Sequence, residues 1–109
     1  MRDYFVYILS NVSRTLYIGV TSNLETRIDA HKRKKNAGFT RDFNVTMLVY
    51  VESFANPADA IAREKQLKNW NRMKKIALIE RANPEWKDLA GDWLSGDADA
   101  NPMVWSAEM

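Results

Sequence analysis

The sequence predicts a domain of the α+β class, because two strands that can form a hairpin are followed by helices and a further strand. Runs rich in Tyr, Val, Ile and Leu cover Tyr4 to Leu9 and Leu16 to Thr21, with polar residues between them. A third strand is predicted from Val45 to Phe54, where Val45, Met47, Val49 and Val51 alternate with the side chains of the other face.

Three helices are predicted in the rest of the chain. The first runs from about Leu24 to Lys35, behind a capping box formed by Ser22 and Glu25. The second follows Asn56 and runs from Pro57 to about Asn69 or Trp70, with Ala60, Ile61, Glu64 and Leu67 facing inward. The third spans about Arg72 to Ala82, and a short helical turn is expected from Glu85 to Trp93.

The length and composition limit the classes of protein that the chain can represent. With 109 residues it forms one domain, which we place at 1–94, followed by an acidic, flexible tail at 95–109. The absence of cysteine excludes disulfides and thiolate chemistry, and the single histidine excludes zinc sites that need several. No secretion signal or membrane-spanning run is evident, so we expect a cytoplasmic protein.

The charge of the chain is distributed unevenly. Residues 1–82 carry fifteen Lys and Arg against eight Asp and Glu, whereas residues 83–109 carry one against six. A basic body favours a polyanionic partner such as nucleic acid, although it implies no sequence specificity and no chemistry. The basic residues around Trp70 are compatible both with a nucleic-acid surface, on which the indole stacks bases, and with a solvated helix face.

Four side chains in the first third of the chain could act together on a phosphate. Tyr7 lies on the first strand and Tyr17 on the second, where each ring can pack in a core or present its hydroxyl at the rim. Arg27 and His31 lie four residues apart and therefore on one face of the first helix. An arginine beside a group that titrates near neutrality suits phosphoryl chemistry, but an ordinary amphipathic surface would have the same spacing.

Glu64 is the most informative single residue, because it lies within an apolar helical stripe where an unpaired carboxylate would be costly. One interpretation is a structural ion pair, for example with Lys68 at i+4. The other is a ligand for Mg²⁺, which commonly binds one or two protein carboxylates and completes its shell with water and substrate phosphate.

Together these residues resemble the GIY-YIG endonuclease family, and in particular its small stand-alone members. The first signature element corresponds to Phe5 to Leu9 and the second to Tyr17 to Thr21. Arg27, His31 and Glu64 then stand in order where that family has its arginine, its histidine or tyrosine, and its metal-binding glutamate. The resemblance covers residues 3 to 93, and departs from the family where Phe5 replaces a glycine and where Val20 replaces a lysine of some relatives.

The resemblance implies a fold and an activity. The fold would be a three-stranded antiparallel sheet flanked by helices, and the activity would be hydrolysis of nucleic-acid phosphodiesters with one Mg²⁺ or Mn²⁺ ion. Glu64 would bind the metal, and the catalytic set would be Tyr7, Tyr17, Arg27, His31 and Glu64. The residues expected to contact substrate are Gly19, Arg27, Lys32, Lys65, Lys68 and Trp70.

Two other functions are compatible with the sequence. One is a nucleic-acid-binding module that keeps the fold without turnover, and the other is a small interaction domain with no nucleic-acid role. For an active enzyme we expect DNA rather than RNA as the substrate, and either weak sequence preference or a partner protein that supplies specificity.

Overall fold

The computed structural model describes residues 3–33, 38 and 42–91. Its centre is a three-stranded antiparallel sheet with the order β2-β1-β3, made of β1 (Tyr4–Ser10), β2 (Leu16–Thr21) and β3 (Met47–Phe54). The helices are α1 (Leu24–Lys32), α3 (Pro57–Asn69) and α4 (Arg72–Ala82). The predicted α+β class and the three-stranded antiparallel sheet are therefore confirmed.

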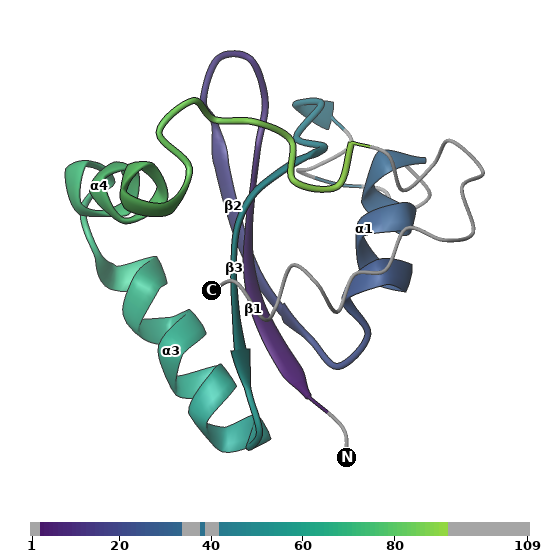
Figure 1. Cartoon of the computed structure of the whole chain (residues 1–109), viewed down its shortest axis with the longest axis vertical. Coiled ribbons are helices and arrows are strands. Elements are labelled where there is room, and N and C mark those ends of the chain that lie inside the picture. The colour runs from purple at the N-terminus through teal and green to yellow at the C-terminus, as the bar shows by residue number, and fades with distance from the viewer. Residues whose placement is uncertain (1–2, 34–37, 39–41, 92–109) are drawn as a thin grey trace.

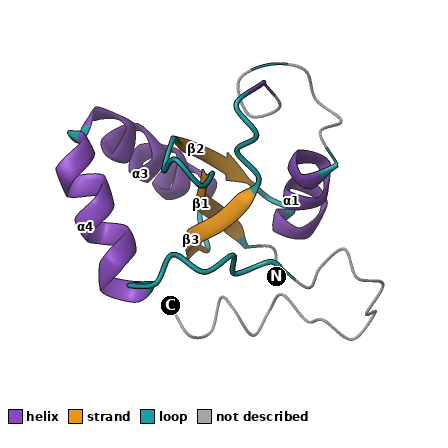
Figure 2. Cartoon of the chain, turned by 90° about the horizontal axis from the view of Figure 1, so that it is seen from above, coloured by secondary structure: helices purple, strands orange, loops and turns teal. Residues whose placement is uncertain are grey.

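Helices cover both faces of the sheet. Figure 1 shows α1 on one side of the strands and α3 and α4 on the other, and the view from above in Figure 2 gives the same arrangement. β1 lies between the other two strands, so it is buried on both faces from Phe5 to Ser10. A buried central strand is consistent with a continuous run of apolar residues.

The core is divided by the sheet into two clusters. On the α1 side, Tyr7 and Leu9 of β1 pack with Leu24 and Ile28 of α1. On the other side, Val6 and Ile8 pack with residues of α3 and α4, including Ala60, Leu67 and Ile79. The alternation along β1 thus places Tyr7 on the same side as the helix that carries Arg27 and His31.

The helices begin and end near the predicted positions, with several corrections. The N-cap of α1 is Asn23, whose side chain accepts a hydrogen bond from the backbone N–H of Thr26, so the predicted Ser22 capping box is wrong. α1 also ends at Lys32 rather than Lys35. On α3, Ile61 is 43% exposed because the buried stripe runs through Ala60 and Leu67.

The third strand differs from the simple alternation predicted for it. The pairing of β1 with β3 is irregular between Ile8 and Leu9, where the partners change from Tyr50 to Leu48 and skip one residue. The irregularity places Leu48 and Val51 in the cluster on the α1 side, and Val49 and Tyr50 in the other. Residues 45–46 lie before the strand instead of within it.

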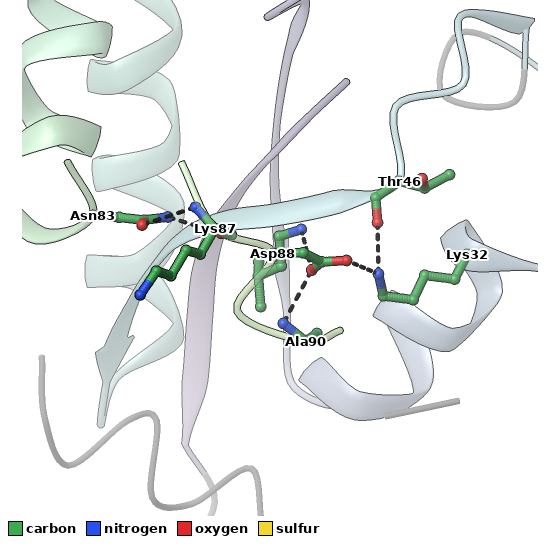
Figure 3. Close-up of polar contacts among 7 residues, drawn as sticks. Lys32, Thr46, Asn83, Lys87, Asp88 and Ala90 are labelled. Atoms are coloured by element: carbon green, nitrogen blue, oxygen red, sulfur yellow. Dashed lines mark hydrogen bonds and ion pairs between the residues drawn. The ribbon is translucent and has the colours of Figure 1, made fainter. Parts of the chain in front are cut away.

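The segment after α4, residues 83–91, is held against β3 and α1 without forming the predicted helical turn. The Leu89 N–H donates to the Leu48 carbonyl at 2.7 Å, and the Asp88 carboxylate accepts from the N–H groups of Leu48 and Ala90. Asp88 also forms an ion pair with Lys32 of α1 (Figure 3). Trp86 is buried, and Trp93, where the predicted turn would end, lies outside the described residues.

Loss of the Asp88 carboxylate should destabilise the fold, because three donors would lose their partner at once. We expect Asp88→Ala to lower the free energy of unfolding by about 2 kcal/mol. Lys32→Met should cost less, since both backbone N–H groups would keep their acceptor. Urea unfolding of the two variants measures the difference, and equal losses would contradict this account.

No helix in the described ranges has the length and apolar character of a membrane span. The predicted tail at 95–109 lies outside the described residues, as does the end of the proposed domain at residue 94.

Candidate active site

Tyr7 occupies the centre of the candidate site, and Gly19 makes room for it. The two residues are direct partners in the β1–β2 ladder. A Cβ atom added at Gly19 would lie 2.5 Å from Cζ of Tyr7 and closer still to its hydroxyl oxygen. Gly19 therefore admits the Tyr7 phenol close to the strand, and its contact with substrate stays a prediction.

Three rings converge beside Gly19. The Tyr7 hydroxyl forms a buried hydrogen bond of 3.2 Å with Nε2 of His31. The Tyr17 ring lies 6.3 Å from that of Tyr7 and 5.4 Å from that of His31, measured between centroids. These tilted contacts join the first strand, the second strand and α1 at one point.

Two opposite charges act on this cluster. The positive charge of Arg27, which is exposed on α1, lowers the pKa of Tyr7, and the negative charge of Glu64 on α3 raises it. Burial has the largest effect and raises the pKa of Tyr7 well above its ordinary value. The five predicted catalytic residues thus lie within electrostatic reach of one phenol.

His31 stays neutral over a wider pH range than an exposed histidine. Burial, and then the neighbouring charge of Arg27, lower the pKa of its imidazole from 6.5. A neutral imidazole can accept a hydrogen bond from Tyr7, whereas a protonated one cannot.

The lowered pKa of His31 predicts a specific pH dependence of stability. As the pH falls, His31 takes up a proton in the unfolded chain before it does so in the folded chain. The contribution of neutral His31 to the free energy of unfolding is therefore fully present above pH 6.5, and it is lost as the pH falls through the lower pKa of the folded state. His31→Gln should remove this dependence while the carboxylates titrate as before. Urea unfolding between about pH 5 and pH 8 tests the difference. Identical pH profiles for the two proteins would refute the prediction.

Glu64 forms the ion pair with Lys68 that one interpretation of the sequence predicted, and its role as a metal ligand stays a prediction. Its side chain is 15% exposed and lies 3.1 Å from Nζ of Lys68, whose own side chain is 54% exposed. Because Lys68 is largely in solvent, the pair is weak, and the carboxylate can exchange this partner. Within the described ranges no three His, Cys, Asp or Glu side chains group as a metal cluster, so a metal at Glu64 would need water and substrate oxygens as its other ligands.

The residues predicted to contact substrate do not form one surface. Lys65 is exposed and Lys68 lies beside Glu64, but Trp70 lies on the other side of the buried stripe of α3. Lys32 has a different role from the predicted one, because its ammonium binds Asp88 and donates to the Thr46 carbonyl at 3.1 Å. Its side chain is only 10% exposed, so it stabilises the fold.

The described structure also contains basic residues that the sequence interpretation did not single out. Arg63 binds Glu52 of β3 with hydrogen bonds of 3.0 and 2.9 Å, and Arg81 lines a cavity between α3 and α4. Arg81 could have been singled out from the sequence, because it lies seven residues after Lys74. That spacing is about two helical turns and places both side chains on one face of α4.

Comparison with known proteins identifies the class to which this site belongs. The family model of the GIY-YIG catalytic domain matches residues 3–77 of the chain. The matched region contains Tyr7, Tyr17, Arg27, His31 and Glu64. The chain therefore belongs to the GIY-YIG family, as the motifs predicted, and this membership points to nuclease chemistry.

Among GIY-YIG proteins, the chain belongs to the UPF0213 group. It is 36% identical over 80 residues to a UPF0213 protein of Staphylococcus haemolyticus, covering 73% of this chain and 98% of the relative. A UPF0213 protein of Clostridium perfringens is 43% identical over 75 residues, covering 69% and 81%. The solution NMR structure of a UPF0213 protein from Bacillus halodurans has a TM-score of 0.53 and 28% identity, covering 79% and 92%.

Proposed function

We propose that this protein is a metal-dependent endonuclease that hydrolyses phosphodiester bonds of nucleic acid, with DNA as the preferred substrate. The observation that carries the proposal is the buried hydrogen bond between Tyr7 and His31, formed under the opposite charges of Arg27 and Glu64. A titratable partner and charges of both signs at the Tyr7 hydroxyl suit proton transfer beside a phosphate.

Tyr7 and His31 form a proton-accepting pair in this proposal. Burial keeps Tyr7 protonated and His31 neutral, and in the tautomer that carries its hydrogen on Nδ1 the Tyr7 hydroxyl donates to Nε2 of His31. When a water molecule attacks phosphorus, the Tyr7 oxygen takes the proton of the water while its own proton passes to His31. The bond from phosphorus to the leaving sugar oxygen then breaks, and that oxygen takes a proton from solvent.

Arg27 and Tyr17 are the groups that would hold the substrate in position. The exposed guanidinium of Arg27 can donate two parallel hydrogen bonds to phosphate oxygens. The Tyr17 ring contacts His31 and is half-buried, so its hydroxyl can orient the attacking water or a phosphate oxygen. Positioning of this kind reduces the entropic part of the barrier.

Glu64 is the residue that would hold the divalent ion. A largely buried carboxylate whose present partner is an exposed lysine is suited to a hard cation that shares its shell with phosphate and water. Mg²⁺ or Mn²⁺ would supply positive charge to the phosphate and to the leaving oxygen. This arrangement fits one ion, with Glu64 as its protein ligand.

A cleavage screen tests the proposal directly. The purified protein is incubated with plasmid DNA, branched DNA, single-stranded DNA and RNA, first with Mg²⁺ or Mn²⁺ and then with EDTA. We expect cleavage of at least one DNA substrate that EDTA abolishes. Salt-dependent binding without cleavage would instead favour the non-catalytic binding module. Neither binding nor cleavage of any of these substrates would favour an interaction domain.

A further inference from the structure

A second site lies between α3 and α4, apart from the candidate active site. It is a cavity of about 340 Å³ that is lined by residues of both helices and of the turn between them. The residues that line it are Arg63, Trp70, Lys74, Ala77, Leu78 and Arg81. On α3, Arg63 and Trp70 lie on one side of the stripe formed by Ala60 and Leu67, whereas Glu64 lies on the other. The two sites thus occupy opposite flanks of the same helix.

The charge of this cavity is positive. Arg63 contributes little net charge, because Glu52 neutralises it through two close hydrogen bonds. Lys74 and Arg81 are exposed, and within the described part of the chain neither forms an ion pair. They lie seven residues apart, which is about two turns of α4, so their charges face the same cavity. A phosphate entering the cavity would meet two cations that have no carboxylate partner among the residues that the structure describes.

The remaining walls of the cavity are aromatic and apolar. Trp70 is the C-cap of α3 and is half-buried, with the Arg63 guanidinium 5.2 Å from the centroid of its ring. Lys74 places its Nζ 5.8 Å from the same ring. Ala77 and Leu78 form the surface of α4 beside it. An indole fixed by a cation, next to an open volume with apolar walls, offers a stacking surface for a planar group.

We propose that this cavity binds one nucleotide of a single-stranded nucleic acid. The base would lie against Trp70 and Leu78, and an adjoining phosphate would lie near Lys74 and Arg81. A base that is paired in a duplex cannot enter such a pocket, so the site would select single strands, flaps or loops. The inference rests on the proposed function only in that its ligand is the nucleic-acid substrate.

The test measures binding without cleavage. Fluorescence anisotropy with a labelled oligothymidylate of about ten nucleotides is recorded in EDTA, using the full chain with Glu64→Gln in every sample. Lys74→Glu should weaken binding about tenfold and reduce the salt dependence of the affinity. Ala77→Leu should also weaken binding about tenfold, since the larger side chain fills the cavity without changing any charge. Leucine is well tolerated at an exposed helical position, so this variant should fold.

A matched control separates the cavity from general surface charge. Lys87→Glu makes the same charge change at a side chain that is 72% exposed and lies outside the cavity, and it should alter the affinity less than twofold. If Ala77→Leu binds like its parent, or if Lys87→Glu weakens binding as much as Lys74→Glu, the proposal is overturned. Failure of the parent protein to bind the oligothymidylate also overturns it.

The cavity and the nuclease proposal can fail independently. Binding that depends on Lys74 and Ala77, in a protein that never cleaves, would support the nucleotide site and refute the enzyme. Metal-dependent cleavage by a protein whose binding is unchanged by both substitutions would support the enzyme and refute the nucleotide site.

Discussion

Replacing Glu64 with glutamine is expected to reduce Mg²⁺-dependent cleavage by about a thousandfold while leaving the protein folded. Glutamine keeps the size of the side chain but loses the charge that a divalent cation requires. The fold should tolerate the change, because in the described part of the chain Glu64 forms an ion pair only with Lys68, whose side chain is 54% exposed. Glu64→Ala should behave in the same way.

Lys68→Ala is the matched control for Glu64, because it breaks the same ion pair and leaves the carboxylate in place. If Glu64 acts only through that pair, the two variants should have similar activity and similar stability. If Glu64 binds the metal, Lys68→Ala should keep Mg²⁺-dependent cleavage with a loss of at most about tenfold, from weaker binding of phosphate.

Cleavage rates at several Mg²⁺ concentrations, together with thermal unfolding, distinguish the two roles of Glu64. An active Glu64→Gln protein would exclude the mechanism proposed above. Loss of activity that accompanies loss of the folded state would point to a structural role instead, so the unfolding measurement is part of the test.

Gly19→Ala is expected to destabilise the protein by about 3 kcal/mol and to remove its activity. Alanine in a strand is ordinarily favoured over glycine by less than about 1 kcal/mol. Here that gain is outweighed, because the new methyl group would overlap the Tyr7 ring, which is 1% exposed and packed in the core. Relief requires Tyr7 to move, and such a movement would break its hydrogen bond with His31.

A double-mutant cycle isolates this contact. In a Tyr7→Leu background the ring is absent, so Gly19→Ala should cost less than about 1 kcal/mol. Gly91→Ala is the control glycine, since its added Cβ would lie 3.4 Å from the Asp88 carbonyl oxygen, at the edge of ordinary contact. Thermal unfolding measures all of these proteins. Equal costs of Gly19→Ala in both backgrounds would show that Tyr7 is not the cause.

Local periodicity predicted the parts of the site that depend on single elements. Strand alternation placed Tyr7 and Leu9 on one face of β1, and both lie in the cluster on the α1 side. A spacing of four residues placed Arg27 and His31 together on α1, and both influence or contact Tyr7. Glu64 could be singled out because a carboxylate within an apolar stripe requires a partner.

Periodicity could not predict contacts that depend on register or on distant segments. The irregular pairing at Ile8 and Leu9 changes which residues of β3 share a face, and no local pattern encodes it. The pairing of Tyr7 with Gly19 follows from the hairpin register, so the phenol over the glycine could not be foreseen from either strand alone. Lys32 and Asp88 are 56 residues apart, and the basic residues that follow Lys32 in the sequence were equally plausible partners for a distant carboxylate.

The 83–91 segment also bears on where this protein can be trimmed for laboratory work. The family match ends at residue 77, so a recombinant version cut to that boundary would lack the Leu89 and Asp88 contacts. Lys32 would then lose its counter-ion on the very helix that presents Arg27 and His31. The family match therefore ends before the contacts that join α1, β3 and this segment, and a version that keeps them extends at least to Gly91.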